Sequence, residues 1–182
     1  MSEKAYLAKI RKGDIDALNA FIEELYPPVY RYVYCRVSGK EEAKDITQEV
    51  FIRFTKQLSS YKSDGKVLAY LYTIAMNCCR SYYRKEQRHN SIEWQEELCG
   101  DTHNISEEVL DNLQFEELKY YLRQLDDKDQ NVLIFHYLKQ MTFKEIADLT
   151  KENEATIKSR HYRALQKIRI LMKEGDSHAT KN

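Results

Sequence analysis

Basic and hydroxyl-bearing side chains lie on one side of a helix predicted near the carboxyl end of the chain. At about 100° per residue, helical spacing separates this side from the apolar side of the same segment. Its members are Thr156, Ser159, Arg160, Arg163 and Lys167. Such groups suit phosphates and base edges, and the major groove of DNA admits one α-helix. We therefore expect this helix to contact DNA; an ordinary amphipathic helix with a solvated basic side is the alternative.

Two helices joined by a short turn are predicted to hold this cationic side. Thr142 and Glu145 form a capping box at the start of the first helix, which ends near residues 150–153. Asn153 is a favourable N-cap for the second helix. The inward side of the second helix consists of Ile157, His161, Ala164, Leu165, Ile168, Leu171 and Met172. Together these signals favour a helix-turn-helix whose second helix enters DNA over the solvated alternative.

The stretch from Leu138 to Arg169 resembles region 4 of the extracytoplasmic-function (ECF) sigma factors, the small promoter-recognition subunits of bacterial RNA polymerase. The matching motifs are EIA at 145–147, TIKSR at 156–160, RAL at 163–165 and IR at 168–169. EIA alone occurs in many helix-turn-helix regulators, whereas the combination at this spacing is specific. The resemblance implies that the minus-thirty-five promoter element is recognised by Thr156, Lys158, Ser159, Arg160, Arg163 and Lys167.

Charge is segregated along the chain, although its formal net charge is zero. No Lys or Arg occurs from His89 through Leu118, a span that contains nine carboxylates. Charged residues make up 32% of the 182 residues, and the chain has only 5 Gly and 2 Pro, which favours an all-α protein. We therefore predict two small helical domains joined by an acidic flexible linker.

The sequence gives no sign of a membrane segment or a cofactor. No apolar run approaches the length of a membrane span, and the amino terminus lacks a signal-peptide core, so a cytoplasmic protein without direct membrane insertion is expected. The cysteines, Cys35, Cys78, Cys79 and Cys99, lack metal-ligand spacing, and we expect reduced thiols. A zinc site completed by His89 and His103 is the disfavoured alternative.

An amphipathic helix is predicted over residues 41–58. Its inward side consists of Ala43, Ile46, Val50, Phe51 and Phe54. Its outward side carries Asp45, Gln48, Glu49 and Arg53, and a solvated surface is the ordinary reading of such a side. The segment DITQEVF resembles the D-x-T-Q-E-x-F motif of sigma region 2, which docks on the coiled-coil clamp helices of the polymerase's largest subunit. The resemblance implies that Asp45, Gln48 and Glu49 bind polymerase, together with Arg53.

Aromatic and cationic side chains alternate in the loop at residues 59–66 and in the helix predicted after it. Single-stranded DNA requires this combination, because rings stack on unpaired bases while cations hold the backbone. The resemblance assigns the segment to the minus-ten element, and the residues implied are Tyr61, Lys62, Tyr70, Asn77, Arg80 and Arg84. Packing in the core is an equal alternative for each tyrosine here. Tyr70, Met76 and Ser81 depart from the Trp, Arg and Asp usual in the family, which bears on base preference.

The resemblance extends from about Gly13 to Lys173. It divides the chain into sigma region 2 at 1–88, an acidic linker at 89–112, sigma region 4 at 113–175 and a tail at 176–182 that is expected to fray. Before the helix-turn-helix, helices are predicted at Leu113–Leu125 and from a cap at Asp126 to Leu138. The second of these is expected to bury Val132, Leu133, Phe135 and Tyr137. Near the amino end, Asp14 is a plausible N-cap, and Pro27-Pro28 are expected to break or kink the helical run, so that two helices meet near the prolines.

The resemblance implies a sigma factor that binds core RNA polymerase and directs initiation at promoter DNA. A stand-alone helix-turn-helix regulator is the alternative, but such a protein would carry a ligand-binding, receiver or dimerisation domain in place of the first half. An enzyme is disfavoured, because the sequence has no metal-ligand spacing, nucleophile turn or phosphate-binding glycine loop. Family members are commonly held by an anti-sigma factor, often a membrane-anchored one, so such a partner is expected.

Overall fold

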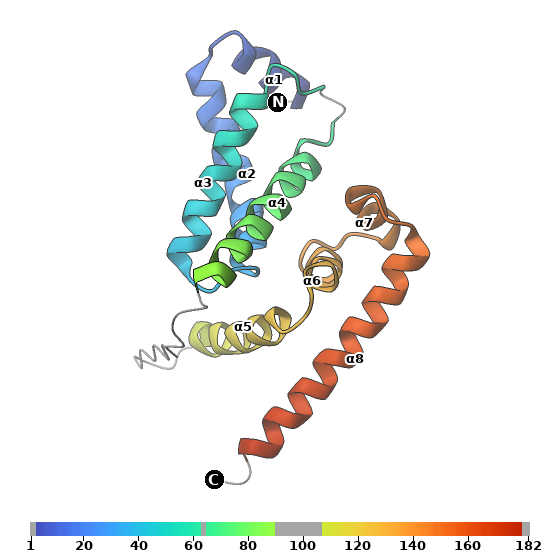
Figure 1. The fold of residues 1–182 in the computed structure, drawn as a ribbon. Coiled ribbons are helices and arrows are strands. Elements are labelled where there is room, and N and C mark those ends of the chain that lie inside the picture. Colours follow the sequence, from blue (N-terminus) through green and yellow to red (C-terminus); the bar gives the residue numbers. More distant parts are fainter. Residues whose placement is uncertain (1–2, 63–64, 90–106, 180–182) are drawn as a thin grey trace. The chain divides into compact units, whose positions relative to one another are not determined.

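Helices account for all the regular secondary structure in the described part of the chain, which comprises residues 3–62, 65–89 and 107–179 of a computed structural model (Figure 1). This confirms the predicted all-α fold class. The chain divides into two compact units, Met1–Tyr82 and Tyr83–Asn182. Most of the predicted acidic linker, residues 90–106, lies outside the described residues, as do the last residues of the tail, 180–182.

Unit 1 contains α1 (Glu3–Arg11), α2 (Ile15–Tyr34), α3 (Lys40–Gln57) and most of α4 (Val67–His89). Gly13, with φ of +87°, makes the turn between α1 and α2 in a conformation that suits glycine. The predicted cap at the start of α2 is confirmed, because the Asp14 carboxylate accepts a hydrogen bond from the Ala17 N–H at 2.9 Å. Val33, Phe54 and Leu71 are fully buried between α2, α3 and α4.

Of the predicted break or kink at Pro27-Pro28, the break into two helices is wrong, because α2 continues through both prolines. A proline inside a helix removes an N–H donor and leaves the carbonyl four residues earlier without its usual partner. These carbonyls belong to exposed residues of α2, where water can satisfy them. Stacked rings also hold the two halves of the helix in line: Tyr26, Tyr30 and Tyr34 stack in succession at centroid distances of 5.9 and 5.8 Å.

Unit 2 contains α5 (Glu107–Arg123), α6 (Asp127–Leu133), a π-helical turn η2 (Ile134–Leu138), α7 (Phe143–Thr150) and α8 (Glu154–Ala179). The first of these, α5, begins six residues earlier than Leu113, the predicted start. The prediction that Tyr137 is buried is wrong, since 55% of it is exposed. A π-helical turn changes the angular register of the residues that follow it, which periodicity alone does not reveal.

The predicted helix-turn-helix is confirmed at α7 and α8. Both hydrogen bonds of the capping box between Thr142 and Glu145 are present. The turn contains Lys151 in the left-handed region, with φ of +57°, and Asn153 accepts a hydrogen bond from the Thr156 N–H at 3.1 Å. Helix α8 extends to Ala179 and so enters the segment 176–182 predicted as a tail; a single glycine in a helix costs only about 1 kcal/mol.

Candidate nucleic-acid interface

The outward side of α8 has most of the residues predicted to contact DNA. Ser159, Arg163 and Lys167 are exposed, and Thr156 is half-buried beside them near the start of the helix. Lys158 is also exposed and pairs with Glu154 at 2.7 Å, a surface ion pair one helical turn apart. The opposite side of α8 packs Ile157, His161, Ala164 and Ile168 into the core, as predicted, but the prediction that Met172 faces inward is wrong, since 45% of it is exposed.

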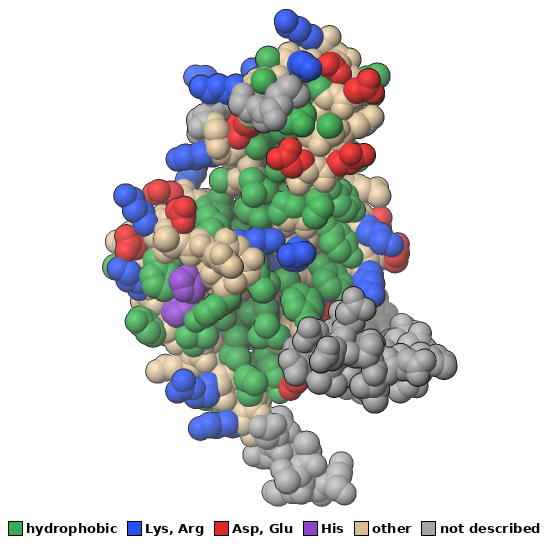
Figure 2. Space-filling model, turned by 180° about the vertical axis from the view of Figure 1, so that it is seen from behind, with side chains coloured by type: hydrophobic (Ala, Val, Ile, Leu, Met, Phe, Trp, Pro, Cys, Tyr) green, Lys and Arg blue, Asp and Glu red, His purple; other side chains and the backbone are tan. Residues whose placement is uncertain are grey.

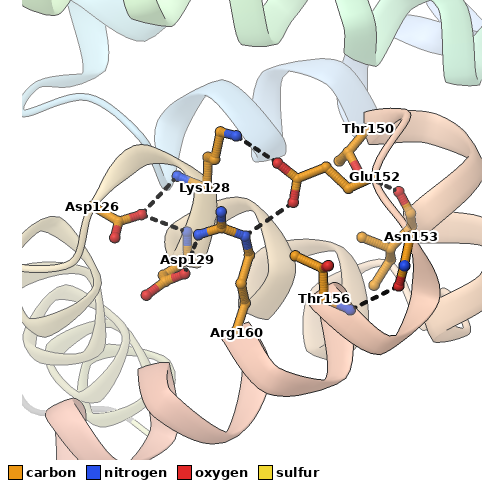
Figure 3. A network of polar contacts seen from close by, with 9 residues as sticks. Asp126, Lys128, Asp129, Thr150, Glu152, Asn153, Thr156 and Arg160 are labelled. Atoms are coloured by element: carbon orange, nitrogen blue, oxygen red, sulfur yellow. Dashed lines mark hydrogen bonds and ion pairs between the residues drawn. The ribbon is translucent and has the colours of Figure 1, made fainter.

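Arg160 occupies a different environment from the other cations of α8. Its Nη1 donates to Asp129 Oδ1 at 3.0 Å, and its Nε donates to Glu152 Oε2 at 2.9 Å (Figure 3). Glu152 also pairs with Lys128, whose Nζ lies 2.6 Å from Oε1. Only 17% of the Arg160 side chain is exposed. Its guanidinium therefore joins α8 to α6 and to the turn that precedes α8.

The charges in this network stabilise one another. Burial by itself lowers the pKa of Arg160, but hydrogen bonds to Asp129 and Glu152 outweigh it, so the pKa of the guanidinium lies above its ordinary value. Hydrogen bonding from Lys128, followed by that from Arg160, holds the pKa of Glu152 below its ordinary value. Asp126 caps α6 by accepting hydrogen bonds from the N–H groups of Lys128 and Asp129 at 3.0 and 2.9 Å. The network is thus built on a capped helix start.

Aromatic rings and imidazoles pack between η2, α7 and α8. The rings of His136 and Phe143 stack with centroids 4.6 Å apart, and His161 lies 5.1 Å from both of them. Figure 2 shows imidazoles in purple among hydrophobic side chains in green. The Tyr137 hydroxyl lies 3.0 Å from His161 Nε2. Burial, and then the neighbouring His136, lowers the pKa of His161, so the packing favours a neutral ring.

A polar stripe follows the exposed side of α4. Asn77, Arg80 and Arg84 are exposed, and their spacing of three and four residues places them on one side of the helix. The Arg80 guanidinium lies within 3.4 Å of the Asn77 side-chain oxygen. Tyr70 precedes the stripe by two turns, so the predicted minus-ten residues of α4 share one side of one helix.

Tyr61 and Tyr70 form an aromatic pair where the loop after α3 meets α4. Their ring centroids lie 4.9 Å apart, and both rings contact Phe54 at 5.9 and 6.2 Å. Both tyrosines are half-buried, whereas Lys62 is exposed. Tyr72 lies in the core instead, where burial raises its pKa to about 12. The alternative of core packing therefore applies to Tyr72, whereas Tyr61 and Tyr70 remain partly exposed.

The outward side of α3 combines acidic, amide and apolar groups. Asp45 and Gln48 are exposed, and Glu49 pairs with the exposed Arg53 at 2.6 Å. Ile52, which the sequence reasoning passed over, lies on the same side at i+7 from Asp45 and is 46% exposed. Tyr162 on α8, which is 66% exposed between Lys158 and Arg163, is a second exposed residue that the sequence pattern did not indicate. An apolar residue on a polar side of a helix was the available signal in both cases.

The structure offers no metal cluster of three or more His, Cys, Asp or Glu side chains among the residues it describes. Cys35, Cys78 and Cys79 are buried, and burial raises the pKa of Cys78. Cys99 and His103, named in the zinc alternative, lie outside the described residues. Within the described part of the chain, none of the helices is both long and apolar enough to cross a membrane.

Two family models match the chain where these surfaces lie. Sigma-70 region 2 matches residues 21–89, which include α3 and α4, and sigma-70 region 4 matches residues 115–168, which include the helix-turn-helix. Together the two matches cover more than half of the chain. The chain belongs to the ECF group of sigma-70 family sigma factors.

Curated relatives of this sigma factor are themselves ECF sigma factors. BldN of Streptomyces coelicolor is 28% identical over 90% of the chain and 63% of its own length. SigM of Bacillus subtilis is 29% identical over 85% of the chain and 96% of its own length. Among solved structures, the sigma factor RpoE of Bartonella quintana, in complex with the anti-sigma factor NepR, aligns with a TM-score of 0.68. That structure is 19% identical and covers 86% of this chain and 96% of its own, so the likeness supports the fold.

Proposed function

We propose that this sigma factor binds core RNA polymerase and directs initiation by contacting two promoter elements, the minus-ten element through unit 1 and α4 and the minus-thirty-five element through α8. The observation that carries the proposal is the presence of two exposed cationic helix sides, one on α4 and one on α8. Two linked modules that bind one DNA together hold it more tightly than either module does alone. Each unit can therefore bind weakly and still contribute to a specific complex.

The outward side of α3 is the proposed polymerase-binding surface. Asp45, Gln48 and Glu49 lie within about one turn on the same side of α3, and Ile52 lies beside them. A helix with carboxylates next to an apolar side chain suits a basic helical partner, because charge complementarity orients the encounter and apolar contact adds affinity. Arg53, held by Glu49, helps to keep that carboxylate in place.

The minus-ten surface consists of the exposed stripe on α4 and the aromatic pair at its start. Tyr61 and Tyr70 offer aromatic rings for stacking with unpaired bases, while Lys62, Arg80 and Arg84 carry charge to the backbone. Asn77 supplies both a donor and an acceptor on the same side. The combination suits a displaced single strand better than duplex DNA, because the tyrosines need bases that have left the stack.

The minus-thirty-five surface consists of the outward side of α8. Thr156, Lys158, Ser159, Arg163 and Lys167 can reach phosphates and base edges from a helix that lies in the major groove, and Tyr162 adds an apolar contact. Arg160 is the predicted residue for which the geometry supports another role, because its guanidinium already donates to two carboxylates.

An anti-sigma factor is a further proposed partner, and the cytoplasm is the proposed location. The structural relative RpoE is in complex with the anti-sigma factor NepR, which supports a partner of this class. An anti-sigma factor that covers the outward sides of α3 or α4 would compete with polymerase or DNA for the same groups. Polymerase and promoter DNA are cytoplasmic in bacteria, so the proposed activity requires that location.

Transcription in vitro tests the proposal directly. Purified chain is added to bacterial core polymerase on a fragmented genomic library, and the start sites that depend on the chain are mapped by sequencing. We expect a small set of starts that share sequence near positions −10 and −35. Sequence-specific binding to DNA without polymerase, and no dependent starts with it, would instead identify a stand-alone regulator.

A further inference from the structure

Helix α1 contacts both ends of the connection between α3 and α4. At one end, Arg11 Nε donates to the Leu58 carbonyl at 3.3 Å, and its Nη2 donates to the Tyr61 carbonyl. At the other end, the Val67 N–H donates to the Glu3 carboxylate at 3.1 Å. These bonds join residues that lie 47 to 64 positions apart in the chain. Helix α1 is therefore hydrogen-bonded both to the end of the connection that follows α3 and to the end that begins α4.

The two ends of α1 are suited to this arrangement by their chemistry. Arg11, at the carboxyl end, presents a planar fork of donors that can serve two carbonyls at once. Glu3, at the amino end, places a carboxylate at the first turn of α4, where the helix offers unpaired N–H groups and a partial positive charge. The nine residues of α1 separate these groups by roughly 12 Å along the helix axis.

The body of α1 is anchored independently of these polar contacts. Leu7 and Ile10 are buried in unit 1, and the Tyr6 ring lies 5.9 Å from that of Phe21 on α2. An open pocket between α1, α2 and the start of α4 is lined by Glu3, Tyr6 and Val67 among others. Glu3 and Arg11 therefore project from a fixed helix, and hydrogen bonds from a fixed helix can hold a neighbouring segment in one conformation.

The connection between α3 and α4 includes residues of the proposed minus-ten surface. We define the minus-ten loop as residues 58–62 and 65–66, which include Tyr61 and Lys62. Tyr61 is held at its carbonyl by Arg11 while its ring pairs with Tyr70. Ordering a loop costs conformational entropy, and a loop that is already ordered before binding avoids that cost at the moment of contact.

We propose that α1 is a positioning element for promoter opening, in which Arg11 and Glu3 hold the minus-ten loop in the conformation that accepts the displaced DNA strand. The inference rests on the proposed minus-ten function of the loop. The supporting residues of α1, 3–11, precede the region 2 match at residues 21–89. Arg11 acts here through the loop backbone rather than through the DNA.

Hydrogen exchange of the full-length chain, without DNA or polymerase, tests the positioning role alone. The variants are Arg11→Gln and Arg11→Lys, with Lys9→Ala as a control that removes an exposed charge from the same helix. We expect amides at residues 58–62 and 65–67 to exchange about tenfold faster in Arg11→Gln, because two hydrogen bonds from a charged donor are lost, while peptides from α2 and α3 keep their protection. Unchanged exchange at these residues would overturn the proposal.

Promoter opening tests the functional half on a genomic promoter at which the wild-type chain directs initiation with core polymerase. Fluorescence of a 2-aminopurine placed in the minus-ten element reports strand separation. We expect opening to slow by about tenfold in both Arg11→Gln and Arg11→Lys, because the lysine keeps the charge but lacks the planar fork of donors. Opening should stay unchanged in Lys9→Ala. Full rescue by Arg11→Lys would overturn the proposal in favour of a phosphate contact. If the wild-type chain opens no promoter, the proposed function fails, and the exchange result still decides the role of α1.

Discussion

Replacing Arg160 by alanine is expected to destabilise unit 2 by about 2 kcal/mol. The Arg160 and Glu152 side chains are each 17% exposed, and that of Asp129 is 12% exposed. These ion pairs are therefore closer to fully buried pairs than to solvent-exposed pairs. Breaking a buried pair by removing one partner costs about 3–5 kcal/mol, and exposed pairs contribute about 0–1 kcal/mol. Lys128 remains beside Glu152 after the substitution, which places the expected loss between these ranges.

Hydrogen exchange of the full-length chain measures this loss where it occurs. A loss of about 2 kcal/mol corresponds to roughly thirtyfold faster exchange of amides in α6 and the first turns of α8. Arg163→Ala is the matched control, since it removes the same charge from an exposed position on the same helix. A double-mutant cycle with Asp129→Asn should give a combined loss smaller than the sum of the two single losses.

Binding to minus-thirty-five DNA, measured on the same variants, distinguishes positioning from base reading. We expect Arg160→Ala to lose affinity together with protection from exchange, and Arg163→Ala to lose affinity while its protection stays at the wild-type level. If Arg160→Ala kept full protection and still lost sequence-specific binding, its guanidinium would have to contact DNA. That result would refute the reasoning from the network.

Further outcomes follow from other parts of the structure. Arg163→Ala should weaken binding of the polymerase complex to minus-thirty-five DNA by roughly 1–3 kcal/mol in a competition assay, and equal affinity would remove Arg163 from the proposed surface. Charge reversal at Asp45 and Glu49 should weaken binding to labelled core polymerase without changing the far-ultraviolet circular dichroism; unaltered affinity would exclude this side of α3. Thr142→Ala should cost about 1 kcal/mol in urea denaturation, because it removes the cap of α7, and an unchanged midpoint would contradict that. Because the pKa of His161 is lowered on folding, its contribution to stability is complete above pH 6.5 and falls as the pH drops below that value; His161→Gln should flatten this part of the stability profile.

Local features of unit 2 could be predicted from the sequence because each depends on neighbouring residues. The capping box at Thr142 and Glu145 and the cap at Asn153 involve groups three residues apart. The inward side of α8 follows from helical periodicity, which placed Ile157 and Ala164 correctly in the core. The family resemblance added the division into regions 2 and 4, which the two matched models support.

Features that depend on distant residues could not be predicted in this way. In the sequence, Arg160 has the spacing of a DNA-binding cation. Its partner Asp129 lies 31 positions away, and nothing in the local sequence of either residue indicates that the two form an ion pair. Tyr137 was misplaced because a π-helical turn interrupts the period on which its position was inferred. The roles of Arg11 and Glu3 depend on contacts with backbone atoms, which no side-chain pattern encodes.

The division of α8 into separate sides has a consequence for changing promoter preference. Ile157, Ala164 and Ile168 support the core, and Arg160 sets the position of the helix, so substitutions there disturb folding before they alter specificity. Ser159 and Tyr162 are exposed on the outward side. A library randomised at the outward positions alone would therefore retain folded protein in most members, and selection could yield variants that start transcription at new sites while using the same polymerase.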